Sequence, residues 1–147
     1  MENGVFSSLD RTETVEAMRK YLSEWKDWKM KAVQTMPTVG SPSMDGQPHG
    51  SNFDPNKRLD EHANAEYEQE ERVRSCYRLK SISEDEEALC DILYYRFIKR
   101  WSATRTMMWV NDHYSLYLDE RTFRRRQEQA LWEAALMCRN PNVRIYK

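Results

Sequence analysis

Apolar residues recur at helical spacing in several separate segments of the chain, and no segment shows the alternation typical of a strand. This periodicity predicts five helices. They cover approximately residues 10–36, 59–80, 83–101, 102–114 and 119–137. The predicted fold class is therefore all-α.

The segment from Thr38 to Lys57 differs in composition from the rest of the chain. It is rich in Gly, Pro and Ser and has no regular period, which predicts a flexible linker or a loop laid over a surface. The expected organisation is an aromatic N-terminal helix at 1–36, the linker at 37–58 and a helical domain at 59–147. A helix-turn-helix is expected within that domain, at about 102–137.

Four of the predicted helices begin at a residue that can cap them. Asp10 and Ser83 each precede a Glu by three positions, which is the capping-box pattern. Ser102 and Asp119 can accept a backbone N–H at the starts of the fourth and fifth helices. Pro37 ends the first helix.

Each predicted helix has one face on which its inward residues gather. The expected inward residues are Val15, Met18, Leu22, Trp25, Lys29 and Ala32; Tyr67, Val73, Cys76, Tyr77 and Lys80; Leu89, Ile92, Leu93, Phe97 and Trp101; Thr106, Met107, Val110 and Tyr114; and Phe123, Ala130, Leu131, Ala134 and Met137.

The first helix has more aromatic surface than a solvated helix carries. Tyr21, Trp25 and Trp28 need a covering surface, and aromatic anchors are also typical of interface hot spots. Two coverings remain open: the chain's own C-terminal domain, which we favour for part of the stripe, or another chain such as a second copy or RNA polymerase.

Charge is distributed unevenly along a chain of 147 residues whose net charge is -1. Residues 60–71 hold six acids and no base, whereas residues 96–126 hold eight bases and three acids. A basic C-terminal region beside an acidic middle suggests one face for DNA and another for a protein partner.

The three cysteines are odd in number and widely spaced, which predicts buried thiols in a reducing compartment rather than disulfides. No His or Cys spacing is typical of a metal site. No apolar run approaches the ~20 residues of a membrane span, and no targeting segment is evident. We expect a cytoplasmic protein without a membrane or metal partner.

The helix after Asp119 carries the residue pattern that DNA reading requires. Arginines occupy the face opposite the apolar stripe, at the end of the helix that a recognition helix presents to base edges. The expected groove contacts are Arg121, Thr122, Arg124 and Arg125, and Arg126 is expected to reach phosphate or solvent. The alternative interpretation is a solvated arginine-rich face with no DNA partner.

The start of the fourth helix is the expected phosphate-binding element. Ser102, Thr104 and Arg105 combine hydroxyl groups, free backbone N–H groups and a positive charge.

Catalysis is not expected, and no cofactor is implied. The pairs Asp112/His113 and Glu61/His62 are adjacent in sequence, so on a helix their side chains point about 100° apart. The glycine-rich segment holds neither a phosphate-cradling Gly-Lys-Ser/Thr nor a Gly-x-Gly-x-x-Gly pattern.

Three capped helices, from Ser83 to Met137, resemble the tri-helical DNA-binding domain of sigma factor region 4. The match is clearest over Leu118–Leu131, with apolar residues at Leu118, Phe123, Ala130 and Leu131 and a capping residue at Asp119. Beyond that region, the aromatic first helix, the Pro/Gly/Ser-rich middle and the terminal Glu-Arg-Thr-Phe-Arg-Arg-Arg are similar to phage late transcriptional regulators of the ArpU and RinA type. The resemblance implies an activator of late packaging and lysis genes. A phage DNA-packaging component, similar to a small terminase subunit, is the alternative.

Overall fold

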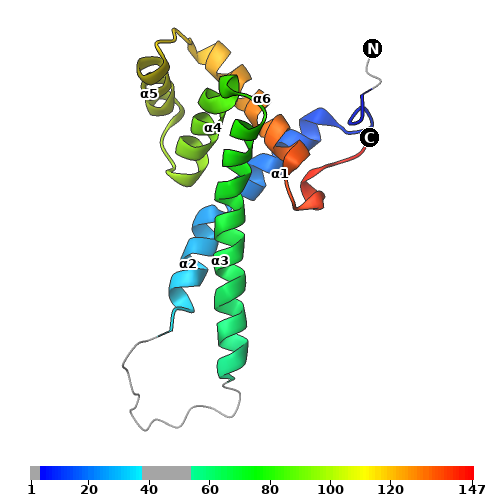
Figure 1. The fold of residues 1–147 in the computed structure, drawn as a ribbon, viewed down its shortest axis with the longest axis vertical. Coiled ribbons are helices and arrows are strands. Elements are labelled where there is room, and N and C mark those ends of the chain that lie inside the picture. The colour runs from blue at the N-terminus through cyan, green and yellow to red at the C-terminus, as the bar shows by residue number, and fades with distance from the viewer. Residues whose placement is uncertain (1–3, 38–53) are drawn as a thin grey trace.

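The computed structural model describes residues 4–37 and 54–147. Their helices are α1 (Arg11–Ser23), α2 (Trp25–Gln34), α3 (Pro55–Tyr77), α4 (Glu87–Leu93), α5 (Ala103–Tyr114) and α6 (Glu120–Met137) (Figure 1). The described part of the chain holds no β-strand, only one isolated bridge between Leu9 and Tyr146. The predicted all-α class is confirmed.

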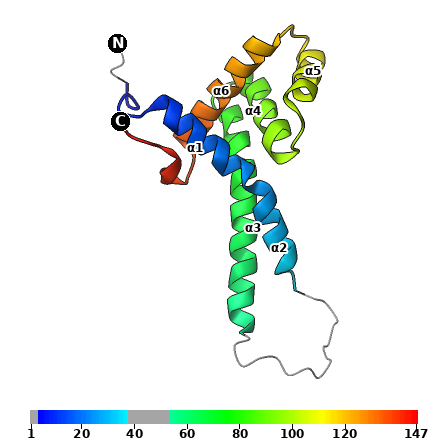
Figure 2. The same ribbon diagram turned by 180° about the vertical axis from the view of Figure 1, so that it is seen from behind.

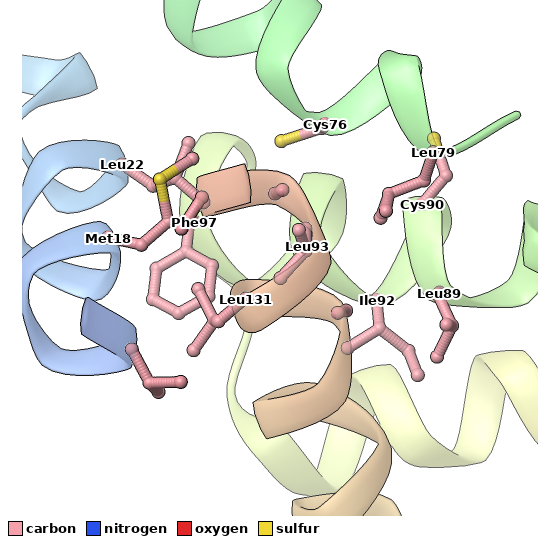
Figure 3. Close-up of a cluster of buried hydrophobic side chains, with 14 of the residues drawn as sticks. Met18, Leu22, Cys76, Leu79, Leu89, Cys90, Ile92, Leu93, Phe97 and Leu131 are labelled. Atoms are coloured by element: carbon pink, nitrogen blue, oxygen red, sulfur yellow. The ribbon is translucent and has the colours of Figure 1, made fainter. Parts of the chain in front are cut away.

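The core lies where α1, the C-terminal end of α3, α4 and α6 meet. Met18 and Leu22 of α1 face Leu131 of α6, and Cys76 and Leu79 enter from the end of α3 (Figure 3). Several of these side chains have no exposed surface at all, so they stabilise the fold by removing apolar area from water. The first helix is therefore part of the same core as the C-terminal helices.

The predicted single helix from Asp10 to Met36 is wrong, because the helix breaks at Glu24 into α1 and α2. The buried side chain of Arg72 on α3, 48 residues from Glu24 in sequence, lies at this break. Its Nε donates to the Tyr21 carbonyl at 2.7 Å, and its Nη2 donates to Glu24 Oε1 at 2.9 Å. Its Nη1 pairs with Glu68 at 2.7 Å. The guanidinium thus satisfies polar groups at the break.

α3 begins at Pro55, capped by Asp54, so the last residues of the predicted linker are helical. Residues 38–53, which hold most of that linker, lie outside the described part of the chain. The predicted inner edge of this helix is wrong at Tyr67, Tyr77 and Lys80, which are exposed. The buried positions of α3 are Ala65, Glu71, Arg72, Ser75 and Cys76. Glu71 and Arg72 can be buried because each is paired with an opposite charge.

The predicted helix from Ser83 to Trp101 is replaced by three short elements. A 3-10 turn (Glu84–Glu86) leads into α4, and a π-helical turn (Tyr94–Ile98) follows it. The Ser83 side chain makes no capping hydrogen bond. The expected inward residues of this segment are nevertheless buried, except for the half-buried Trp101.

Two features complete the shape. α2 packs antiparallel to α3, and together they project from the core as a hairpin, in the direction away from α5 (Figures 1 and 2). At the other side, the segment before α1 lies beside the C-terminal segment: the Asp10 N–H donates to the Ile145 carbonyl at 2.7 Å.

Candidate nucleic-acid interface

Five residues, 115–119, join α5 to α6, and one side chain, that of Asn111, fixes their conformation. Ser115 ends α5 in the left-handed conformation, with φ of 55°. Asn111 then binds Leu118 twice: its Nδ2 donates to the Leu118 carbonyl at 3.0 Å, and its Oδ1 accepts the Leu118 N–H at 2.9 Å. The turn therefore has a defined geometry, which sets where α6 begins.

Asp119 caps α6, as predicted. Its Oδ1 accepts the Thr122 N–H at 2.8 Å. This hydrogen bond, together with the nearby Arg121 and Arg125, holds the pKa of the Asp119 carboxyl below its usual value. The carboxylate also suits the positive end of the helix dipole.

The two faces of α6 differ sharply in chemistry. Phe123, Ala130, Leu131 and Ala134 are buried as predicted, whereas Met137 is only half-buried. Gln127 is also buried, which the apolar pattern did not indicate. The inner face therefore anchors the helix along most of its length.

The outer face near the start of α6 carries the predicted arginines. Arg121, Arg124, Arg125 and Arg126 are exposed, and Thr122 is half-buried. Among the residues that the structure describes, no ion pair involves any of these four arginines. Asp119, Glu120 and Glu128 lie nearby, but none of them is within ion-pair distance of these guanidinium groups.

The start of α5 is capped as predicted, because Ser102 Oγ accepts the Arg105 N–H at 3.1 Å. Ser102, Thr104 and Arg105 are all exposed. The Arg105 guanidinium lies 3.9 Å from the centre of the Trp101 ring, so it is held by a cation–π contact. Stacking covers one face of the guanidinium and leaves its N–H edge available.

A column of aromatic rings holds α5 against the π-helical turn. Tyr95 stacks on Trp101 at 4.4 Å between ring centres, and it also contacts Trp109 of α5 at 4.6 Å. His113 stacks on the other side of Trp109 at 4.6 Å. Such contacts stabilise the position of α5 beyond the area they bury.

A cleft of about 330 Å³ lies between α1, the start of α5 and α6. It brings together two of the predicted residues, Thr104 and Arg124. Its basic lining also includes Arg19 of α1 and Arg96 of the π-helical turn, which the sequence analysis missed. Glu120 and Glu128 of α6 line it as well. Arg121, Thr122, Arg125, Arg126, Ser102 and Arg105 are not among its lining residues.

Arg96 serves as a structural link at the base of this cleft. Its Nε donates to the buried Gln127 Oε1 at 3.0 Å, and its Nη1 donates to the Trp101 carbonyl at 2.7 Å. Burial and the nearby Arg19 lower the pKa of the Arg96 guanidinium. Arg19, by contrast, has only an exposed contact to Glu16 at 3.2 Å.

Other kinds of site find little support among residues 4–37 and 54–147. They hold no cluster of His, Cys, Asp and Glu suited to a metal ion. Cys76, Cys90 and Cys138 are free and buried, as predicted, and burial raises the pKa of the Cys90 thiol to about 12. No described helix is long and apolar enough to span a bilayer.

Comparisons of the chain with protein-family models, curated proteins and solved structures gave no significant match.

Proposed function

We propose that the protein is a sequence-specific DNA-binding transcription regulator that reads the major groove with the first half of α6. In this proposal α4, α5 and α6 form a helix-turn-helix domain similar to sigma factor region 4. The observation that carries it is the set of exposed arginines at the start of α6, which have no ion-pair partner among the described residues.

Folding alone does not favour these arginines. The N-terminal end of a helix carries partial positive charge, so cations there are unfavourable by a few tenths of a kcal/mol each. Arg121 and Arg125 are four residues apart, a spacing at which like charges repel. Glu120 and Glu128 each lie four residues from Arg124 and offset part of its charge, but no acid lies three or four residues from Arg121. A polyanion would convert this unfavourable arrangement into a favourable one.

The proposed division of labour follows the orientation of the residues. Arg121, Thr122, Arg124 and Arg125 would contact base edges, and Arg126 would reach a phosphate.

The structure adds one residue to the proposed phosphate contacts, which the sequence places at Ser102, Thr104 and Arg105. Arg19 lines the same cleft as Thr104 and Arg124, so it is proposed as a further backbone contact.

The resemblance to phage late regulators of the ArpU and RinA type supplies the biological role in this proposal. The protein would activate late packaging and lysis genes in the cytoplasm of a bacterial host, with RNA polymerase as a possible second partner.

The test begins with selection of bound duplexes from random DNA, followed by titration of the selected and a scrambled duplex. Arg121→Ala and Arg125→Ala should each weaken binding to the selected duplex by about 1–3 kcal/mol and leave scrambled-duplex binding much less affected. Arg19→Ala and Arg105→Ala should weaken binding to both duplexes equally. Each should also reduce the salt dependence of binding, the slope of log K against log salt concentration, by about one unit.

Arg74→Ala is the matched control, because Arg74 is exposed on α3 and does not line the cleft. Thermal unfolding should show that Arg121→Ala is as stable as the unchanged protein or slightly more stable, so that lost binding is not lost folding. Equal losses for all five variants on both duplexes would contradict the recognition assignment.

A DNA-packaging component remains the second candidate, and the projecting α2–α3 hairpin favours it. An oligomerising hairpin beside a DNA-binding domain is what a ring of subunits requires. Stoichiometry separates the two: a ring of many subunits would support packaging, and a monomer or dimer would support transcription.

A further inference from the structure

The α2–α3 hairpin has an unusual distribution of side-chain sizes. The residues buried between its two helices are small: Ala32 of α2, Thr35 directly after α2, and Ala65 of α3. Half-buried Trp25 and Trp28 add to this seam near the body. Large apolar side chains point outward instead. A helical hairpin that is stable without a partner would bury its large apolar side chains between the helices and expose its polar ones.

The outward apolar side chains are Met30 and Val33 of α2, Met36 just beyond it, and Leu59 and Tyr67 of α3. Their exposed fractions lie between 48% and 55%.

Three of them lie at the same level of the hairpin, near the end farther from the core. Two contacts fix the register there: Arg58 Nη2 donates to the Gln34 carbonyl at 3.2 Å, and Thr35 Oγ1 lies 3.1 Å from His62 Nδ1. Leu59 lies between the two α3 residues of these contacts. Gln34 and Thr35 are the partners in these contacts, and Val33 and Met36 lie directly before and after them. Val33, Met36 and Leu59 therefore occupy one level of the hairpin, and we name them the tip cluster.

The charges of the two helices are opposite. α2 holds three lysines and one aspartate, whereas residues 59–71 of α3 hold six acids and no base. Among the described residues, Lys26, Lys29 and Lys31 form no ion pair. A surface that presents a basic helix beside an acidic one is complementary to itself after a two-fold rotation, since each basic helix then meets an acidic one.

We propose that the occupant of this surface is a second copy of the chain, so that two α2–α3 hairpins pack into a four-helix bundle around the tip clusters. Each α2 lies on the α3 of the partner. α3 is about 35 Å long at 1.5 Å per residue, and among the described elements α2 is the one that lies beside its outer half (Figure 1). The second hairpin supplies the large-residue core that one hairpin lacks. This inference does not rest on DNA binding.

The first experiment is sedimentation velocity of the full chain over a concentration series. The unchanged protein should behave as a dimer at micromolar concentration. Met36→Lys should raise the dissociation constant by at least about tenfold, because a charge then enters the tip cluster. Met108→Lys is the matched control: Met108 lies on α5 with a comparable exposed fraction of 63%, and its replacement should leave the dimer intact.

The second experiment exchanges charges. One variant carries Lys26→Glu and Lys29→Glu, and the other carries Glu66→Lys and Glu70→Lys. Each alone places like charges across both α2–α3 contacts and should become monomeric. The mixture restores opposite charges at both contacts, so it should form a heterodimer. Circular dichroism of each variant confirms that it remains helical.

The outcomes divide cleanly. Dimers that are lost in each charge variant and regained in the mixture support the proposal. A monomer at every concentration overturns it, and so does a ring of more than two copies. A dimer that Met108→Lys disrupts as strongly as Met36→Lys also overturns it, because the contact would then lie elsewhere. DNA titration of the monomeric Met36→Lys variant reports separately on the DNA-binding proposal.

Discussion

The start of α6 and the α2–α3 hairpin both present a surface that folding does not explain, but the two surfaces differ in kind. At α6 the core beneath is filled by Phe123 and Leu131, and the excess on the surface is positive charge. At the hairpin the core beneath is made of small residues, and the excess on the surface is apolar. Exposed arginines without ion-pair partners on a well-anchored helix are suited to binding a polyanion. Large exposed apolar side chains over a core of small residues are suited to packing against another protein surface.

The strongest way to test this contrast is to compare two leucines. Leu131 has no exposed surface beneath α6, whereas Leu59 is 54% exposed at the tip of the hairpin. Leu131→Ala should lower the free energy of unfolding by about 2–5 kcal/mol, because it leaves a cavity in the core. Leu59→Ala should change it by less than about 0.5 kcal/mol in dilute solution, where the hairpin is unpaired.

Urea denaturation of both variants at low protein concentration provides the measurement. Equal losses would show that the hairpin tip is buried within the single chain. The contrast between the two regions would then be wrong.

Interactions between residues close together in the sequence could be predicted, whereas interactions between residues far apart in the sequence could not. The caps at Asp10, Ser102 and Asp119 were predicted correctly, because each involves a side chain and an N–H only three residues away. The capping pattern at Ser83 failed, although its spacing is the same, since the chain enters a 3-10 turn there.

The remaining misses involve partners far apart in the chain. Arg72 of α3 binds polar groups at the break in the first helix, and the buried face of α3 includes charged residues whose partners become neighbours only in the folded chain. The cleft combines Arg19, Arg96 and Arg124 from three elements. No periodicity within one helix carries that information. The arginine face of α6 was visible because it lies on a single helix.

A smaller effect is expected where the hairpin joins the body. Arg72 contacts the carbonyl of Tyr21 and the carboxylates of Glu24 and Glu68, and its own side chain is only 3% exposed. Arg72→Met should cost about 3 kcal/mol of unfolding free energy, because the partly buried carboxylates and the carbonyl lose their donor. Arg74→Met, at an exposed pair two residues on, should cost less than about 0.5 kcal/mol.

Urea denaturation compares the two arginine variants. Hydrogen exchange of α2 adds a second readout, since loss of Arg72 should speed exchange in α2 more than in α6. Unchanged exchange in α2 would mean that its packing on α3 does not depend on this contact.

The smallest expected effect concerns pH at the start of α6. The Thr122 hydrogen bond, with Arg121 and Arg125 nearby, lowers the pKa of the Asp119 carboxyl in the folded protein. A lowered folded pKa means that the carboxylate stabilises the fold fully above the unfolded pKa, and that this stabilisation is lost as the pH falls through the folded pKa.

Asp119→Asn keeps an oxygen that can accept the N–H but has no charge. Its Tm should therefore lie slightly below that of the unchanged protein at about pH 7, and the gap should close as the pH falls through the lowered pKa of the Asp119 carboxyl in the folded protein. Taking the difference between the two proteins cancels the titration of all other groups. A Tm gap that stays constant from neutral to acid pH would show that the Asp119 charge does not stabilise the start of α6, and that the neighbouring arginines do not act on it.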